Sequence, residues 1–229
     1  MKKGRTKRSF AAALILGAAL AGALFGGCRD IISYEEREYD SSLADGGSDA
    51  DASVPNTCAA YCDLVQTLCT GPNAQYASVD SCLGLCSTFP AGAPGDTSGH
   101  SIACRIQVLQ STTMLEDTDC AAAGPGGAGT CGSNCDAYCA GMAVICPATF
   151  ESPTDCTAEC DPLIECPPYH VTAATPNDPS IQCRLYHLSS AAVGILSKEP
   201  GVDTAAQVKH CPHASGVTEC IAVADPACP

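Results

Sequence analysis

The pattern of apolar and charged residues divides the chain into three stretches. A basic head at residues 2–8 precedes an uncharged run over residues 10–27 that is built mostly of Ala, Leu, Ile and Gly. An acidic stretch interspersed with Gly, Ser and Pro follows over residues 29–57. From Cys58 onward cysteines recur at spacings of four and eleven residues, which are typical of one face of an α-helix.

The first stretch has the layout of a secretory signal. Its apolar run is a little short for a membrane span, and small residues precede Cys28. The segment from Leu24 to Cys28 is similar to a lipobox, although Phe25 stands where an aliphatic residue is usual. Ordinary cleavage after Ala23 is the alternative. We expect residues 1–27 to be a lipoprotein signal peptide and Cys28 to carry the lipid.

The cysteine count supports lipidation of Cys28. The chain has 19 cysteines, an odd number that would leave one exposed thiol in an oxidising compartment. With Cys28 lipidated, 18 remain and can form nine bridges. We therefore expect a cell-envelope protein, an outer-membrane lipoprotein facing the periplasm or the cell surface.

Charge excludes one class of partner. Five of the 11 basic residues lie before Cys28, so the exported chain has six bases against 25 acids. Such a body repels phosphate backbones, so we expect no nucleic-acid binding. The partners expected are the membrane, through the N-terminal lipid, and an envelope or extracellular protein.

Residues 28–57 are expected to form a lipidated acidic linker. This stretch cannot bury enough apolar surface to fold. The segment from Asp49 to Ser53 resembles the start of a calcium loop, but it lacks the turn glycine and the closing glutamate. The linker interpretation is preferred.

After the linker the chain repeats itself. Two sets of eight cysteines follow the same order, and neighbouring residues also match, such as Tyr61 with Tyr138 and Arg105 with Arg184. The sequence predicts cysteine-rich helical module 1 over 58–131 and module 2 over 132–229. The first set is Cys58, Cys62, Cys69, Cys82, Cys86, Cys104, Cys120 and Cys131. The second set is Cys135, Cys139, Cys146, Cys156, Cys160, Cys183, Cys211 and Cys220, and module 2 alone adds Cys166 and Cys228.

The cysteine spacing predicts a mainly α fold. The expected helices are 57–70, 134–146, the segments after Ser78 and Ser152, and third helices near 98–114 and 179–196. The fold class is therefore two tandem disulfide-stapled small helical modules, each a helical hairpin plus a third helix, after a disordered acidic tether. Large apolar side chains are few, so we expect bridges rather than a core to hold each module.

Facing helices imply particular disulfides. The expected rungs of the two hairpins are Cys58–Cys86, Cys62–Cys82, Cys135–Cys160 and Cys139–Cys156. We expect the third helices to be held by Cys69–Cys104 and Cys146–Cys183. Elimination leaves Cys120–Cys131, Cys211–Cys220 and Cys166–Cys228. Metal thiolates are the alternative to bridges, but they persist in reducing compartments.

Histidines are the other concentrated chemistry. His187 lies one turn after Cys183, and His210 and His213 flank Cys211. Three imidazoles would suit copper or zinc. The matching positions of module 1 are Val108, Asp119 and Ala122, and the alternative is that the histidines are polar surface or packing residues.

Two arginines occupy one equivalent position in the two modules. Arg105 and Arg184 are two of the four bases after Cys58, and we expect each guanidinium to satisfy carboxylates or helix-end carbonyls. A ligand-anchoring role is the alternative.

The sequence contains no recognisable motif around a catalytic nucleophile, so an enzyme is not expected.

These residues resemble a group of largely uncharacterised cysteine-rich tandem-module lipoproteins of Gram-negative bacteria. The likeness rests on the Cys-x3-Cys pairs, on residues 95–99 (Gly-Asp-Thr-Ser-Gly), on Cys104-Arg105 and Cys183-Arg184, and on the segment 210–213. It covers most of residues 58–229 and implies no particular activity. The function expected is an envelope-anchored binding or structural module without a cofactor. The alternative is a copper, zinc or haem carrier that uses the histidines of module 2.

Overall fold

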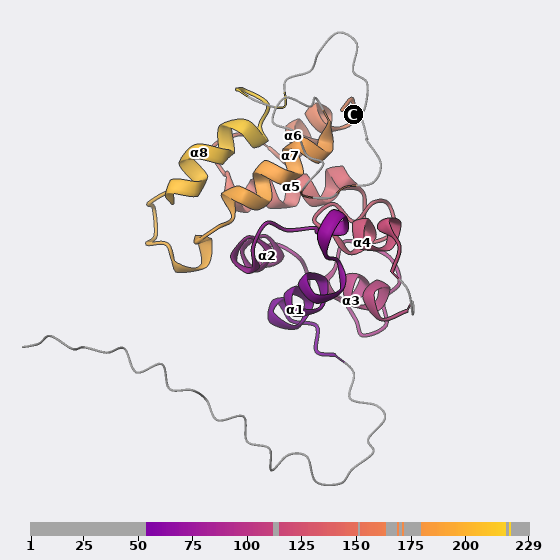
Figure 1. Ribbon diagram of the computed structural model, residues 1–229. Helices are drawn as coiled ribbons and strands as arrows, with labels where there is room; N and C mark the ends of the chain where they lie inside the picture. The colour runs from indigo at the N-terminus through magenta and orange to yellow at the C-terminus, as the bar shows by residue number, and fades with distance from the viewer. Residues whose placement is uncertain are drawn as a thin grey trace, which may run out of the picture. The chain divides into compact units, whose positions relative to one another are not determined.

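The expectation of a mainly α fold is confirmed. The computed structural model describes residues 54–111, 115–150, 152–163 and 180–218, together with Tyr169, Val171 and Cys220. These residues form α-helices and short 3-10 helices and contain no β-strand (Figure 1). In chain order the elements are α1 (Cys58–Leu68), η2 (Gly71–Asn73), α2 (Val79–Cys86), α3 (Ile102–Ser111), α4 (Asp117–Ala123), α5 (Asn134–Ile145), α6 (Pro153–Cys160), α7 (Ile181–Ala191), η3 (Ile195–Ser197) and α8 (Ala205–Ala214).

Side-chain caps define where most of these helices begin. Ser78 accepts a hydrogen bond from the backbone N–H of Ser81, and Ser152 accepts one from that of Asp155. Both serines begin the helices that the sequence predicts after them. The same capping occurs at Thr57, Ser133, Ser180 and Thr204. Each cap satisfies one of the backbone donors that a helix N-terminus leaves unpaired.

The third helix of each module is shorter than predicted. α3 begins at Ile102 rather than near residue 98, because Gly95 and Gly99 have φ angles of +83° and +86° that are incompatible with a right-handed helix. α7 ends at Ala191, and Gly194 follows with φ of +76°. α4 and α8 are additional helices that the cysteine spacing did not predict.

The four predicted rungs of the helical hairpins are confirmed. Helices α1 and α2 are joined by Cys58–Cys86 and Cys62–Cys82, with Cα–Cα distances of 5.6 and 5.9 Å. Helices α5 and α6 are joined by Cys135–Cys160 and Cys139–Cys156, each at 5.7 Å. Cysteines four residues apart on one helix thus each pair across the hairpin.

Four other predicted bridges are wrong. The predictions Cys69–Cys104, Cys120–Cys131, Cys146–Cys183 and Cys211–Cys220 assumed three helices in each module. The structure instead has Cys69–Cys120, Cys104–Cys131, Cys146–Cys211 and Cys183–Cys220. The physical reason is the fourth helix: α4 and α8 carry Cys120 and Cys211 to the C-terminal ends of α1 and α5. The predicted pair Cys166–Cys228 lies outside the described residues.

The corrected bridges strengthen the interpretation of the chain as a duplication. Numbered in order within each matched set of eight, which leaves out Cys166 and Cys228, the cysteines pair first with fifth, second with fourth, third with seventh and sixth with eighth in both copies. Chance is a poor explanation for the same pairing order twice, since eight cysteines allow 105 pairings. The repeat is therefore one of three-dimensional connectivity as well as of sequence.

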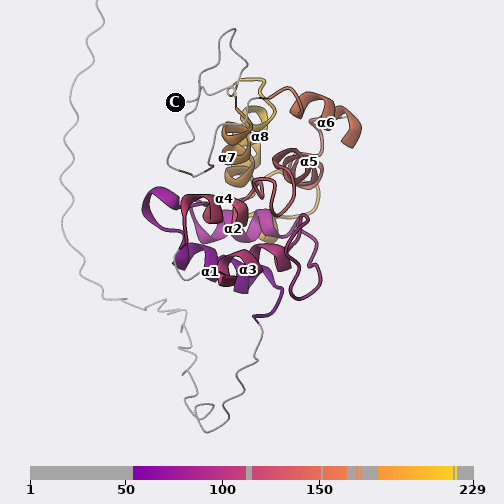
Figure 2. The same ribbon diagram turned by 90° about the vertical axis from the view of Figure 1, so that its right-hand side faces the viewer.

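Helix α7 lies at the centre of the region that positions the histidines. It contacts α8 and α5 of its own module and α2 of module 1, and α7 and α8 lie side by side in both views (Figure 2). Gly84 of α2 approaches the backbone carbonyl of Ala192, which follows α7. Two large apolar side chains of α7, Leu185 and Leu188, are fully buried. Module 1 therefore supports one face of α7.

Among the described helices, none combines the length and the apolar character that crossing a bilayer requires.

Candidate metal centre

The three predicted histidines come from two neighbouring helices. His187 lies on α7, one turn after Cys183, while His210 and His213 lie three residues apart on α8 and so share a face. The disulfide Cys146–Cys211 ties α8 to the C-terminal end of α5. The position of α8 is thus fixed covalently next to two of the histidines.

The structure brings these three imidazoles together. One ring nitrogen from each of His187, His210 and His213 lies within 4.8 Å of the other two. The Nδ1 atoms of His187 and His210 share a hydrogen bond of 3.0 Å, and these two rings are stacked with centroids separated by 5.3 Å. The ring of His213 is perpendicular to that of His187, at 4.7 Å between centroids.

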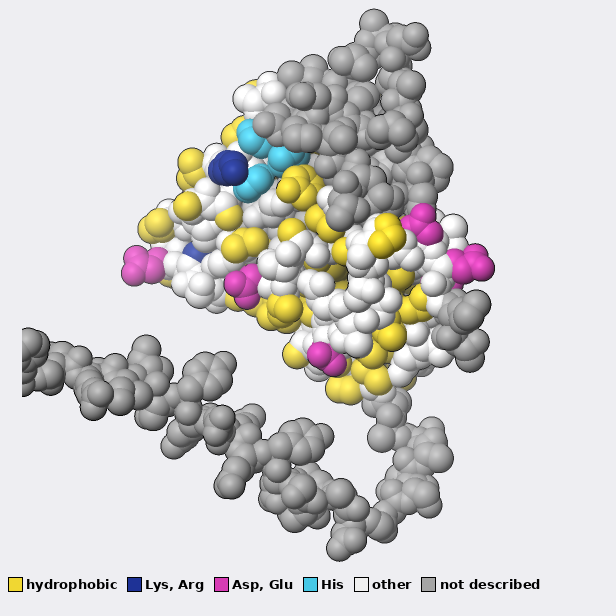
Figure 3. Space-filling model, in the orientation of Figure 1, with side chains coloured by type: hydrophobic (Ala, Val, Ile, Leu, Met, Phe, Trp, Pro, Cys, Tyr) yellow, Lys and Arg dark blue, Asp and Glu magenta, His cyan; other side chains and the backbone are white. Residues whose placement is uncertain are grey.

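The cluster lies at the boundary between core and solvent. His187 is 3% exposed, whereas His210 and His213 are half-buried. Histidine side chains gather in one patch on the face shown in Figure 3, beside a basic side chain. A ligand bound by the three rings would therefore have one side buried by α7 and would be reached from solvent past α8.

This spacing suits a transition-metal ion. Two nitrogens about 2.05 Å from a tetrahedral zinc ion lie about 3.3 Å from one another, close to the separation of the two Nδ1 atoms. Neutral imidazole is also a preferred ligand of copper. Three protein donors leave a fourth position for water or another ligand, as in zinc sites that exchange their ligands.

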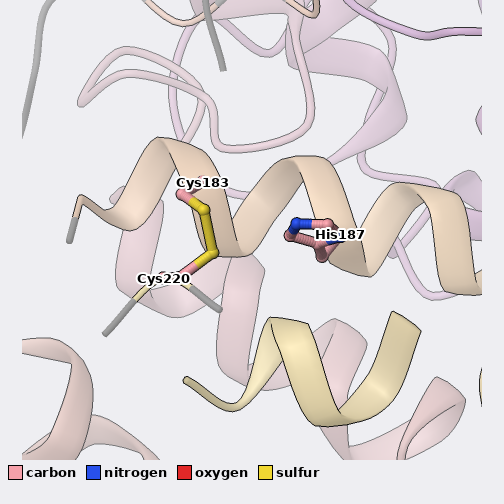
Figure 4. A group of neighbouring side chains, drawn as sticks. All are labelled: Cys183, His187 and Cys220. Atoms are coloured by element: carbon pink, nitrogen blue, oxygen red, sulfur yellow. A yellow bond between two sulfur atoms is a disulfide. The ribbon is translucent and has the colours of Figure 1, made fainter. Parts of the chain in front are cut away.

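A disulfide borders the same cluster. Cys183 and Cys220 form a bridge, and His187 follows one turn along α7 (Figure 4). The two sulfur atoms and one ring nitrogen of His187 all lie within 4.8 Å of one another. While the sulfurs are bonded to each other they are not thiolates, so the oxidised protein offers three imidazoles as its ligand set.

Module 1 has no histidine at the equivalent positions, but it contains His100, which no sequence pattern pointed to. His100 lies in the loop before α3, where its Nδ1 accepts a hydrogen bond of 3.2 Å from the guanidinium of Arg105. The ring of Phe89 packs against His100, with centroids 4.7 Å apart. Burial and the neighbouring positive charge of Arg105 lower the pKa of His100 to about 4. His100 is thus a neutral packing histidine, and no spacing in the sequence marked it.

Arg105 itself has the structural role expected for it. Its fully buried guanidinium donates to the carbonyl oxygens of Gly124, Ser101 and Pro125, and Gly124 is the C-cap of α4. It also stacks over the ring of Phe89, 4.1 Å from the centroid. The prediction of a guanidinium that satisfies helix-end carbonyls is confirmed for Arg105.

Arg184 occupies the matching place in module 2 but has different partners. Its Nη1 donates to the hydroxyl of Tyr138 at 3.5 Å, and its guanidinium lies against Gly216. A Cβ atom at Gly216 would come within 2.5 Å of Nη2. Gly216, two residues after α8, therefore makes room for the guanidinium of Arg184, whereas the segment after α4 contacts Arg105 by accepting hydrogen bonds at Gly124 and Pro125.

One comparison with known proteins gives a match. The model of the BfoA family C-terminal domain matches residues 34–158, more than half of the chain. The chain belongs to this family. The match includes module 1, α5 and most of α6, and it ends before α7 and α8, which carry the histidine cluster. No curated protein and no solved structure matches the chain.

Proposed function

We propose that this BfoA-type protein is an envelope-anchored lipoprotein whose second module binds a zinc or copper ion through His187, His210 and His213. The observation that carries the proposal is the convergence of the three ring nitrogens within 4.8 Å. Module 1, which contains no such cluster at the equivalent positions, acts as a structural partner that supports α7. The activity is binding rather than catalysis.

The charge of the chain supports a cationic ligand. Acidic residues exceed basic ones by 17 to four from Cys58 onward. A field of this sign raises the local concentration of divalent cations and speeds their association. It disfavours anionic ligands at the open coordination position, so water is the expected fourth ligand.

The arrangement favours a single ion over haem. The three ring nitrogens lie within 4.8 Å of one another, which suits one small ion, whereas the macrocycle of haem would need a broad apolar slot beside one axial imidazole. His187 and His210 instead stack on each other with 29° between their ring planes. The partial exposure of His210 and His213 is consistent with an ion that is loaded and released rather than locked in place.

Metal titration of the full chain in detergent, with all disulfides intact, tests the proposal. Calorimetry with Zn²⁺ or Cu²⁺ should give one equivalent bound at pH 7.5. Affinity should fall as the pH is lowered, because protons compete with the metal ion for the ring nitrogens. The double variant His210→Ala/His213→Ala should lose the site, whereas the control His100→Gln should keep it. If the oxidised wild-type protein binds neither metal, the proposed metal site is refuted, and the alternative of a binding or structural module without a metal remains.

The membrane anchor is a separate part of the proposal. Cys28 follows small residues, and assigning it to a lipid leaves an even number of cysteines. The intact mass of the mature protein should include an acylated Cys28, and Cys28→Ser should block processing. An unacylated mature chain that begins at Leu24 would contradict this assignment. The anchor would hold the metal site within the envelope, where an envelope or extracellular protein is the expected partner.

A further inference from the structure

The disulfide Cys183–Cys220 lies beside the histidine cluster. We propose that opening of Cys183–Cys220 creates a site for a thiophilic ion, such as Zn²⁺, with Cys183, Cys220 and His187 as ligands. This site shares His187 with the proposed three-histidine site but does not depend on it. It uses thiolates, which the oxidised protein does not offer.

Geometry already groups the three donors. Cys183 and His187 are four residues apart on α7, so they share one helix face, and Cys220 reaches that face from the segment after α8. The two sulfurs and one ring nitrogen of His187 lie within 4.8 Å of one another (Figure 4). Two sulfurs that bind one tetrahedral zinc ion lie about 3.8 Å apart. After the bond is broken, only a small shift of Cys220 is needed to reach this separation.

The burial of Cys183 and Cys220 favours thiolates that are bound to a cation over thiolates without one. Cys183 and Cys220 are fully buried, and His187 is 3% exposed. A buried thiolate without a partner is strongly disfavoured, and a bound divalent cation removes that penalty. Reduction without metal would therefore leave thiols in a dry site, whereas reduction with metal would give a stable complex.

Backbone conformation distinguishes this bridge from its counterpart in module 1. Cys220 has a φ angle of +53°, in the left-handed region that side-chain-bearing residues rarely adopt, and Cys131 does not. Opening Cys183–Cys220 would allow Cys220 to leave this uncommon conformation, whereas Cys131 has no such conformation to leave. Module 1 also has Val108 where module 2 has His187, so its two cysteines lack the third ligand.

The chemistry requires a dithiol reductant, and an envelope thiol–disulfide oxidoreductase is the class that would supply it. One thiolate of the dithiol attacks a sulfur of the bridge, and its second thiol resolves the mixed disulfide. Two electrons pass to the bridge, the dithiol becomes a disulfide, and its two protons pass to Cys183 and Cys220. Both protons are released when the two thiolates bind the ion.

Thiol trapping on the full chain tests the proposal. The protein is treated with a limiting dithiol, with or without Zn²⁺, and then alkylated, and the modified cysteines are mapped by mass spectrometry. Cys183 and Cys220 should open before Cys104 and Cys131, and Zn²⁺ at ten times its Kd should slow their alkylation about ten-fold. The pair Cys104 and Cys131 is the internal control and should show no zinc effect. Equal protection of both pairs, protection of neither, or earlier opening of Cys104–Cys131 would overturn the proposal.

Two variants separate this site from the three-histidine site. His187→Ala should abolish zinc protection of Cys183 and Cys220, with helical circular dichroism checking that the fold is kept. His210→Ala/His213→Ala should abolish metal binding by the oxidised protein yet retain the zinc protection after reduction. Loss of that protection in the double variant would contradict an independent thiolate site. Protection without metal binding by the oxidised wild type would overturn the three-histidine function alone.

Discussion

Tyr61 and Tyr138 occupy equivalent positions on α1 and α5, and each donates its hydroxyl to the last carbonyl of the fourth helix of its own module. The acceptors are the backbone oxygens of Ala123, at the end of α4, and Ala214, at the end of α8. Both rings are fully buried. The tyrosine thus ties the first helix of each module to its fourth, beside the bridge from the third cysteine to the seventh.

Removing either hydroxyl should therefore destabilise the protein by a similar amount. Tyr61→Phe and Tyr138→Phe each leave a buried carbonyl without its donor, which typically costs about 1–3 kcal/mol. Guanidinium unfolding with the disulfides intact measures this change in the free energy of unfolding. The exposed substitution Leu196→Ala is the control and should stay within about 0.5 kcal/mol of wild type. A near-zero effect of either tyrosine variant would contradict the anchoring role.

Much of this arrangement follows from local sequence signals, and the part that failed depended on distant contacts. Periodic cysteines and serine or threonine caps specify α1, α2, α5 and α6, so the rungs of both hairpins could be predicted. α4 is only seven residues long, and α8 contains Pro212, so neither has a clear helical pattern. Without these helices the bridges of Cys69 and Cys146 could not be assigned.

The candidate site was predictable for a related reason. His187, His210 and His213 were conspicuous because they lie close in sequence to Cys183 and Cys211. Packing of α7 on α8 brings the three rings together, and Cys183–Cys220 ties α7 to the segment that follows α8. His100 has no such neighbour and its role depends on a contact with Arg105. A histidine next to a cysteine in the sequence could therefore be proposed as a site residue, whereas the role of an isolated histidine could not be predicted.

Helix packing between the modules depends on Gly84. A Cβ atom there would collide with the backbone carbonyl oxygen of Ala192 at the end of α7. Helix propensity alone predicts that Gly84→Ala stabilises α2 by about 1 kcal/mol. We expect the opposite sign, a loss of about 1–3 kcal/mol, because overpacking against backbone cannot relax easily. Thermal unfolding decides between them, and a raised melting temperature would show that α2 and α7 do not pack this closely.

His100 should make stability depend on pH in a defined window. Its pKa of about 4 in the folded protein lies below the value of about 6.5 for a free imidazole. The folded state therefore binds fewer protons than the unfolded state between these values, so the free energy of unfolding falls as pH drops from about 6.5 to 4. His100→Gln should remove this part of the decline. Parallel pH profiles of wild type and variant over that window would refute the assignment.

The bridge Cys146–Cys211 should matter for metal binding in a way that its counterpart does not. It closes a sequence separation of 65 residues, and Cys69–Cys120 closes one of 51, so removing either should cost about 4 kcal/mol. Only Cys146→Ala/Cys211→Ala frees α8, which carries His210 and His213. Calorimetry should show weaker zinc binding in that variant alone. An equal loss in Cys69→Ala/Cys120→Ala would mean that general destabilisation, rather than the placement of α8, sets affinity.

X-ray absorption spectroscopy of the fully oxidised, zinc-loaded full chain is the decisive test of the three-histidine site, because it identifies the atoms bound to the ion. We expect three imidazole nitrogens at about 2.0–2.1 Å, one further light ligand and no sulfur. The imidazole contribution should disappear in His210→Ala/His213→Ala. A first shell made of carboxylate oxygens, or of sulfur in the oxidised protein, would contradict the three-histidine site.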